Sequence, residues 1–409
     1  MSSQQGAWYP LRNRTFRALW IAMLISNIGT WMHDIGAGWH MTSLSASPLM
    51  VALVQTATTL PMFALALVAG ALADSFDRRR YLIVTQCWLL VVAATLGVLT
   101  LSNLTSATVL LAMTLLMGIG SAMMMPAWSA VTPNVVPRDA LREAIALNSL
   151  SINLARAIGP AIAGLIVVRL GSGAVFLINA CTFVAVLVAL YRWQYEPRRV
   201  RIERQAILPA IGEGLRYVRR APAFQSVMLR GVSFYLFASA LWALLPLVAR
   251  GLPDGDATTF GLLVAGMGVG AVTGGVSLSG IRRRVSSDRL ILCASVLFAA
   301  GVASLSIAVS LPIAFVAVCA CGFAWISVLS TVHTAVQLTL DDDVRSRALS
   351  VYMMSFMGSM AIGSATWGKV ASVYGVPTAL AAAGVTLALF AWPAMRFSLV
   401  PAETTVVEL

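Results

Sequence analysis

The stretch "GALADSFDRRR", residues 70–80, closes a long apolar run with two carboxylates and three arginines, and another apolar run follows it. Of the 409 residues in the whole chain, 59% are hydrophobic and only 11% are charged. A water-soluble domain of this length cannot bury so much apolar surface. We therefore interpret residues 70–80 as a polar connection between two segments that cross a membrane.

The apolar residues on both sides of this connection form twelve segments separated by short polar breaks. Segments of about 20 to 27 residues match the length of a helix that crosses a hydrocarbon core of about 30 Å. We predict helices because lipid offers no partners to backbone polar groups and the runs are far longer than barrel strands. The predicted spans are residues 17–42, 49–73, 81–102, 106–131, 145–169, 172–192, 224–249, 258–281, 289–309, 312–338, 346–371 and 376–397.

The positive charges lie on one side of this twelve-span arrangement. The net charge is +12 at pH 7, and all but four of the 28 Lys and Arg residues fall at the same side. The exceptions are Arg156, Arg169, Arg250 and Lys369. This distribution follows the positive-inside rule and predicts that both termini and residues 70–80 are cytoplasmic. Aromatic residues do not alternate with the basic ones, so we expect no nucleic-acid partner.

Cysteine and histidine usage favours neither a disulfide framework nor a metal site. The five cysteines all fall within predicted spans, and their number is odd. Cys319 and Cys321 would point about 200° apart on a helix. The three histidines are widely separated, and the sequence contains no H-E-x-x-H or G-x-S-x-G motif. We expect no metal, no cofactor and no enzyme activity.

The opening stretch has a second copy 204 residues further along the chain. Gly70 pairs with Gly274, and the arginines 78–80 pair with the arginines 282–284. The same ungapped separation also relates Gly118 to Gly322, Asp139 to Asp343, Gly159 to Gly363, Gly164 to Gly368, Gly171 to Gly375 and Arg192 to Arg396. The chain is therefore interpreted as a doubled unit of six helices.

Each copy has an even number of spans, so the two copies enter the membrane in the same direction and are related by an axis along its normal. This predicts an all-α membrane protein with an N-terminal six-helix bundle at residues 1–192 and a C-terminal bundle at residues 224–409. Between them, residues 193–223 are predicted to form a basic amphipathic linker on the cytoplasmic leaflet.

Several of these segments resemble a known family. "GALADSFDRRRYLI" resembles the cytoplasmic loop signature of the major facilitator superfamily. Residues 27–39, 52–74 and 148–166 resemble its enterobactin-exporter and transmembrane-secretion-effector branch, which is of the drug:proton antiporter type. The resemblance implies two pseudo-symmetric bundles that work by alternating access. Two residues depart from the signature: Ser75 replaces a basic residue, and Asp77 replaces a glycine, which removes a tight turn.

The loop signature implies a conformational latch. Gly70 is expected to permit close approach of the second span to a neighbour, and Asp74 is within i,i+4 reach of Arg78. By resemblance, Asp74 faces the positive end of the eleventh span near Arg347, with Arg79 belonging to the same latch. The alternative is a solvated loop that only sets the topology.

The fifth span contains "ARAIGPAIAGLI", which resembles the antiporter signature G-P-x-x-G-G with Ala163 in place of one glycine. Gly159, Pro160 and Gly164 would open a groove for tight, movable packing. An ordinary proline kink is the alternative. In the eighth span, a glycine repeats every four residues and predicts close helix packing; these are Gly266, Gly270 and Gly274.

Polar residues within the first and fifth spans mark the candidate site. Asn27, Trp31 and Asp34 share one face of the first span, and Asn153 and Arg156 share a face of the fifth. Intramembrane charges are costly, so we predict that Asp34 pairs with Arg156. Two interpretations stay open: a static structural ion pair, and a pair that opens on protonation or substrate binding.

The seventh and tenth spans supply the other candidate residues, which are Phe234, Trp242, Trp325 and His333. They are candidates for substrate contact. The alternative for the aromatic residues is packing or an interfacial belt, and the alternative for His333 is a polar group with its hydrogen bonds satisfied inside the protein.

The interpretation is a secondary transporter, monomeric in a bacterial inner membrane, that exports bulky amphipathic molecules of siderophore or drug type. We expect it to meet a small-molecule substrate, membrane lipids and protons as the coupling ion. A lipid or lysolipid transporter is the first alternative. A membrane-embedded enzyme, receptor or scaffold subunit is the remote one.

Overall fold

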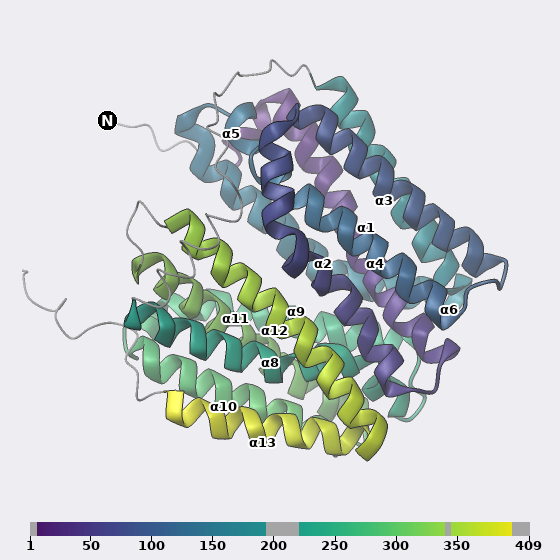
Figure 1. Cartoon of the computed structure of the whole chain (residues 1–409), viewed down its shortest axis with the longest axis vertical. Coiled ribbons are helices and arrows are strands. Elements are labelled where there is room, and N and C mark those ends of the chain that lie inside the picture. The colour runs from purple at the N-terminus through teal and green to yellow at the C-terminus, as the bar shows by residue number, and fades with distance from the viewer. Residues whose placement is uncertain (1–5, 194–220, 340–344, 395–409) are drawn as a thin grey trace, which may run out of the picture. The chain divides into compact units, whose positions relative to one another are not determined.

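The computed structural model describes residues 6–193, 221–339 and 345–394 (Figure 1). These residues are almost entirely helical, with no strand among them. The long helices coincide with the predicted spans, and spans five and six are joined in α6. Their bounds are α1 Arg14–Leu44, α2 Pro48–Ser75, α3 Arg78–Leu101, α4 Ala107–Ser129, α6 Leu141–Arg192, α8 Pro222–Gly251, α9 Ala257–Arg282, α10 Ser287–Leu305, α11 Leu311–Thr339, α12 Arg345–Tyr374 and α13 Val376–Ala394. The short elements are η1 Tyr9–Arg12, α5 Thr132–Val135 and η2 Arg138–Ala140.

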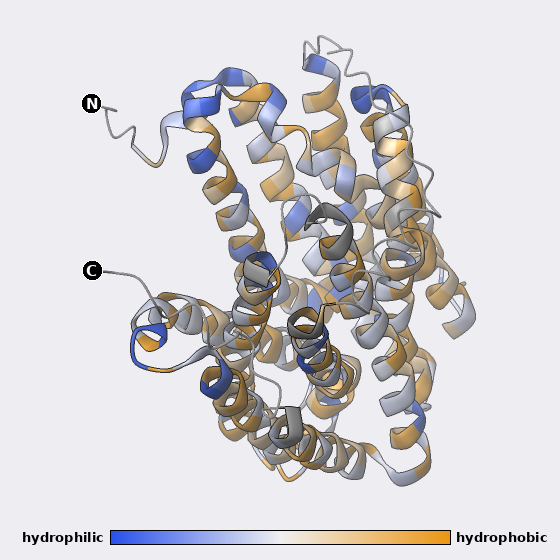
Figure 2. Cartoon of the chain, turned by 60° about the vertical axis from the view of Figure 1, so that its left-hand side comes forward, coloured by the Kyte–Doolittle hydropathy of each residue, from blue (hydrophilic) through white to orange (hydrophobic). Residues whose placement is uncertain are grey.

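Most helices have the length and composition of membrane spans. In the part of the chain that the structure describes, eight helices are long and apolar enough to cross a membrane, and one of these, Arg138–Arg192, holds two predicted spans. Helix α1 falls short of that criterion because Asn27, His33 and Asp34 interrupt its apolar sequence. Figure 2 shows the hydrophilic residues concentrated at helix ends and in the connections between helices.

The predicted repeat is visible in the backbone. Helix α4 begins at Ala107 and α11 at Leu311, and α6 begins at Leu141 and α12 at Arg345. The two members of each pair therefore begin 204 residues apart, which is the separation of the sequence repeat. The glycine pair at the same separation shares an unusual conformation: Gly171, between spans five and six, has φ 81°, and Gly375, between α12 and α13, has φ 86°. Both connections therefore turn the chain with a glycine at positive φ, where other residues are strained.

Replacing the first of these glycines should weaken the fold. Gly171 has φ 81° and ψ 167°, a combination that is essentially restricted to glycine. We expect Gly171→Ala to lower the free energy of unfolding by about 1–3 kcal/mol, measured by thermal unfolding in detergent. Gly70→Ala is the matched control, since Gly70 is helical and a Cβ there would meet nothing within 4 Å. Equal stabilities of the two variants would contradict the prediction.

The Cα positions group the chain into two compact units. The first unit comprises residues 1–44, 64–203 and 256–265, and the second comprises 45–63, 204–255 and 266–409. The helices α2 and α9 are thus each shared between the units. Of the predicted linker, residues 194–220 lie outside the described part of the chain, so its amphipathic helix stays a prediction.

Within the first unit, α1 packs along both halves of α6. Three contacts advance together along the two helices, so α1 and the first half of α6 run in the same direction. Trp20 Nε1 donates to Leu147 O at 2.9 Å, Asn27 Nδ2 donates to Ser151 Oγ at 3.3 Å, and Gly159 packs against Trp31. This parallel pair positions the polar residues of the candidate site.

Within the second unit, α9 and α11 pack backbone to backbone, which confirms the prediction from the glycine repeat of the eighth span. A Cβ at Gly270 would overlap the carbonyl oxygen of Cys319, and a Cβ at Gly274 would lie 3.0 Å from the carbonyl oxygen of Phe323. From the other helix, a Cβ at Gly322 would overlap the carbonyl oxygen of Met267.

Candidate functional site

The arginines of the 70–80 stretch bind the ends of neighbouring helices. Arg78 Nη1 donates to the carbonyl oxygen of Ala130 at 3.2 Å, directly after α4. Arg79 donates through Nε to Leu190 O at 2.8 Å and through Nη2 to Tyr191 O at 2.5 Å, at the last turn of α6. Carbonyls at a helix C-terminus lack partners within the helix and carry partial negative charge. The two arginines therefore anchor the start of α3 to the ends of α4 and α6.

Two expectations for this stretch need correction. The close approach predicted for Gly70 is wrong for the described residues, because Gly70 is partly exposed on α2 and a Cβ there would meet nothing within 4 Å. Asp77 does more than remove a turn glycine: its carboxylate accepts the backbone N–H of Arg80 at 2.8 Å and so caps the N-terminus of α3. The side chains of Asp74 and Arg347 lie outside the described part, so their latch stays a prediction.

The Gly159–Gly164 segment of α6 packs closely on two neighbours. A Cβ at Gly159 would lie 2.8 Å from Trp31 Cβ and 3.1 Å from Ile28 O, both on α1. A Cβ at Gly164 would lie 2.7 Å from Ala257 O at the start of α9. The helix continues through Pro160. Gly159 and Gly164 thus permit close packing on α1 and on the start of α9, while the groove for movable packing stays a prediction.

A cation and an amide come together beside this segment. Arg156 lies with its guanidinium carbon 5.4 Å from the centre of the Trp31 ring, a cation–π contact. One turn earlier on α1, Asn27 donates to Ser151. Arg156 is partly exposed, yet its Nε is buried without a hydrogen-bond partner. We call Asn27, Trp31, Ser151 and Arg156 the arginine–tryptophan cluster.

Asp34 and Arg156 do not form the predicted ion pair here. Elsewhere among the described residues, an ion pair joins Arg230 to Asp288. The reason is the register of the parallel helices: Gly159 meets α1 at Trp31, so Arg156, three residues earlier, lies at or before Trp31, whereas Asp34 lies a turn beyond it. Asn153 is exposed and donates to Ser149 O in its own helix.

The second unit gathers aromatic rings around Trp325 of α11. Of the predicted residues, Phe234 and Trp242 both lie 5.8 Å from Trp325 between ring centres. The sequence analysis missed further rings of this cluster at 5.6 to 6.3 Å, which are Tyr235, Phe298 and Phe356. These separations are typical of favourable aromatic pairs. We call these six residues the aromatic cluster.

His333 sits at the edge of this cluster rather than within it. Its ring is 5.9 Å from that of Tyr352, and the Tyr352 hydroxyl lies 3.2 Å from the Tyr235 hydroxyl. One sequence signal could have pointed to the missed rings of α12. Tyr352 and Phe356 are four residues apart and therefore lie on one face of that helix. His333 is partly exposed and therefore remains available to a ligand.

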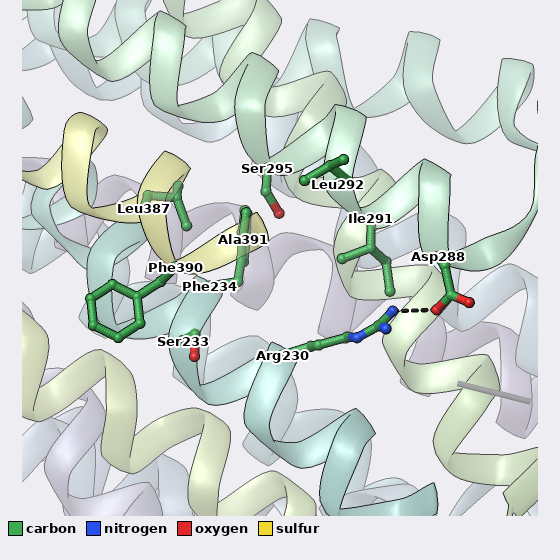
Figure 3. A pocket seen from close by; sticks show the side chains of 10 residues that line it. All are labelled: Arg230, Ser233, Phe234, Asp288, Ile291, Leu292, Ser295, Leu387, Phe390 and Ala391. Atoms are coloured by element: carbon green, nitrogen blue, oxygen red, sulfur yellow. Dashed lines mark hydrogen bonds and ion pairs between the residues drawn. The ribbon is translucent and has the colours of Figure 1, made fainter. Parts of the chain in front are cut away.

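The ion pair between Arg230 of α8 and Asp288 of α10 was also missed, because Asp288 lies one residue before the predicted ninth span (Figure 3). The Arg230 side chain is only 2% exposed, and that of Asp288 is 31% exposed. A buried arginine is tolerated when a carboxylate balances it. In Figure 3 the pair closes one end of a groove whose other residues are mostly apolar.

Comparison with known proteins gives this geometry a context. A sequence profile for transmembrane secretion effectors matches residues 5–408. The staphyloferrin A transporter of Staphylococcus aureus is 25% identical over 362 residues, covering 88% of this chain and 90% of that protein. The enterobactin exporter EntS of Escherichia coli is 26% identical over 409 residues, covering 95% of each chain. The multidrug efflux pump Tap of Mycolicibacterium fortuitum is 24% identical, covering 85% and 86%.

Solved structures share the fold at low identity. A bacterial homologue of the human lysosomal transporter Spinster, in an inward-facing and occupied conformation, superposes with a TM-score of 0.72 at 16% identity, covering 95% of this chain and 98% of that one. A POT family transporter in complex with 5-aminolevulinic acid gives 0.75 at 13% identity, covering 97% and 98%. The fold class predicted from the sequence is therefore confirmed.

Proposed function

We propose that this chain, which belongs to the transmembrane secretion effector family of the major facilitator superfamily, is a proton-coupled exporter of bulky amphipathic molecules of siderophore or drug type. The family and the curated relatives are transporters rather than enzymes, and the chain is a multi-pass membrane protein. Relatives that carry staphyloferrin A, enterobactin and drugs support the proposed substrate class.

The observation that carries the proposal is the placement of Asn27, Asp34 and Arg156 within predicted spans on two parallel, packed helices. Polar and ionisable groups inside a membrane are costly and mark substrate or ion pathways. We assign proton carriage to Asp34, whose carboxyl group gains or loses the proton as Arg156 moves away from it or toward it. The two partly exposed members of the aromatic cluster, Trp242 and Phe356, supply a second, apolar contact for the substrate, and the four buried rings hold them in place.

We further propose that the protein works as a monomer in a bacterial inner membrane with both termini cytoplasmic. The predicted positive-inside distribution supports this orientation. No ATP-binding motif occurs in the sequence, so an ion gradient is the proposed source of energy.

Transport by the purified protein tests the proposal. Reconstituted into sealed vesicles with an imposed pH gradient, the protein should move enterobactin or an amphipathic fluorescent drug against its concentration gradient. Collapsing the gradient with a protonophore should leave only passive exchange. Uphill transport that persists without any proton gradient would contradict proton coupling, and an absence of transport of both probes would contradict the substrate class.

The latch proposed for the 70–80 stretch predicts a separate effect. Asp74→Asn should slow transport while the protein stays folded and inserted, because losing a contact of one state shifts the inward–outward equilibrium by about 1–2 kcal/mol, or roughly 5- to 30-fold. Spin-label distances across the cytoplasmic face should widen. Asp77→Asn is the control: it removes one negative charge from the same stretch, and asparagine still caps α3. If the distances and transport rates of Asp74→Asn equal those of the wild type, residues 70–80 only set the topology of the chain and form no latch.

A further inference from the structure

A cavity on the first unit lies between the N-terminal residues and the start of α6. It encloses about 230 Å³. A site for a single water needs only about 10–15 Å³, so this cavity accommodates a much larger ligand. Its lining comes from two segments of the chain, residues 7–8 and the start of α6: Ala7, Trp8, Arg142, Glu143, Ala146, Leu147 and Leu150.

The walls of this cavity are accessible from outside the protein. Trp8 is 60% exposed and Leu150 is 43% exposed, and Arg142 and Ala146 are exposed as well. Leu147 is the buried exception and belongs to a core cluster formed by α1, the α5–α6 connection and α6. Tyr9 and Leu11 pack against the same cluster, so the residues that follow Trp8 hold it beside α6.

The cavity extends from the depth of lipid headgroups to that of acyl chains. Arg142 and Glu143 precede the predicted fifth span, which begins at residue 145, and Leu150 lies within it. The helix rises about 12 Å from Arg142 to Leu150, whereas the headgroup region of one leaflet is about 5–8 Å thick. Exposed tryptophan, here Trp8, is typical of this interface. The cavity therefore suits a molecule with a polar head and an apolar tail.

The polar end of the cavity carries one acid and one base. Arg142 and Glu143 form no ion pair with another described residue. Within the described part of the chain, Glu143 Oε2 is buried and has no hydrogen-bond partner. A carboxylate only accepts hydrogen bonds, so this atom requires an N–H or O–H donor. A guanidinium group matches the geometry of phosphate. The two side chains together favour a ligand that has both a phosphate and an ammonium group.

We propose that the cavity binds one phospholipid with a primary-amine headgroup, phosphatidylethanolamine. Its phosphate binds Arg142, its ammonium group donates to Glu143, and the start of an acyl chain lies along Ala146 and Leu150. A choline headgroup has no N–H to donate, and a glycerol headgroup has no positive charge, so either would leave the carboxylate without a charged donor. This assignment goes beyond the proposed transport function and does not depend on the transported substrate.

A comparison of two zwitterionic lipids tests the proposal. Phosphatidylethanolamine and phosphatidylcholine share the phosphate and the net charge, so other arginines at the surface do not bias the comparison. The delipidated full-length protein is titrated with each lipid, and the first bound lipid is measured by native mass spectrometry. The wild type should bind phosphatidylethanolamine about tenfold more tightly, because a hydrogen bond to a charged group is worth about that much.

Three variants separate the roles of the two charged residues. Glu143→Met, which keeps the length of the side chain but removes the acceptor, should abolish the tenfold preference. Arg142→Gln should weaken binding of both lipids equally and leave the preference intact, because the phosphate is common to them. Arg138→Gln is the control and should change neither quantity: Arg138 is also exposed, lies four residues before Arg142 and does not line the cavity.

A purely structural role of Glu143 predicts a different result. Its carboxylate lies in the first turn of α6, where the helix N-terminus favours a negative charge. If that is its only role, Glu143→Met loses thermal stability but keeps the lipid preference of the wild type, which would overturn the proposal. Equal binding of the two lipids by the wild type would overturn it too.

Two further measurements test the cavity and the source of the headgroup. Ala146→Trp fills the cavity from an exposed position and should weaken binding of both lipids, so unchanged binding in this variant would contradict the assignment. Soluble phosphoethanolamine, which is the headgroup alone, should not displace the lipid because it lacks the acyl-chain contact. Displacement would assign the cavity to a soluble amino phosphate and overturn the lipid assignment.

Discussion

Asp34→Asn is expected to abolish proton-driven uphill transport in vesicles while substrate binding and passive exchange continue. An amide cannot take up and release a proton, and Asp34 is the acid within a predicted span on the face of α1 that also carries Asn27 and Trp31. Accumulation against a gradient should fall to the passive level. Asp34→Glu, which keeps a carboxyl group, should retain part of the wild-type accumulation.

His333 is the rival proton carrier, since it is partly exposed beside Tyr352. His333→Gln is therefore measured in the same vesicles and should keep proton-driven accumulation. If Asp34→Asn still accumulates substrate at the wild-type rate, the proton does not travel through Asp34. A loss of expression or stability in Asp34→Asn, without a specific loss of coupling, would instead identify Asp34 as a structural residue.

Gly270→Ala should strongly destabilise the second unit. The new Cβ would overlap the carbonyl oxygen of Cys319, a backbone atom of α11 that cannot rotate away as a side chain does. The two helices must separate, and overpacking of this kind costs typically about 1–3 kcal/mol, with backbone clashes at the upper end. We expect the free energy of unfolding in detergent to fall by about 3 kcal/mol.

The same helix offers a matched control. Gly275 of α9 is exposed, and a Cβ there would meet nothing within 4 Å. Gly275→Ala should leave stability unchanged or raise it by up to about 1 kcal/mol, because alanine favours a helix over glycine. Comparable losses in the two variants would show that helix propensity, rather than contact with α11, governs both positions.

Local sequence patterns identified most residues of the candidate site, but they did not identify the side chains that each of these residues contacts. Asn27 and Trp31 share a face because the helical period is fixed, and the predicted Asp34–Arg156 pair implied that the first and fifth spans are neighbours. The Asp34–Arg156 pair was a reasonable inference from charge alone. It fails in this structure because the register between α1 and α6 is set by Gly159 packing at Trp31, which leaves Asp34 a turn beyond Arg156.

The aromatic cluster shows the same limit. Phe234, Trp242 and Trp325 were identified as candidates, yet Phe298 and Phe356 joined them only in the folded chain. They come from α10 and α12, whose rotation about their own axes is set by packing with α8 and α11. Nothing in the local pattern of either segment distinguishes a ring that faces Trp325 from one that faces lipid.

By itself, the sequence determined the membrane-spanning helices, the repeat with its paired glycines at 171 and 375, and the close packing around Gly270. These depend on segment length, composition and the absence of a side chain, which are properties of short stretches of chain. Only the tertiary structure decided that Arg78 and Arg79 anchor helix ends, that Arg156 lies on Trp31, and that Arg230 pairs with Asp288. The physical reason is that a charged side chain takes whichever partner the packed helices bring within a few ångströms, and helix register and rotation are fixed by contacts between residues far apart in the sequence.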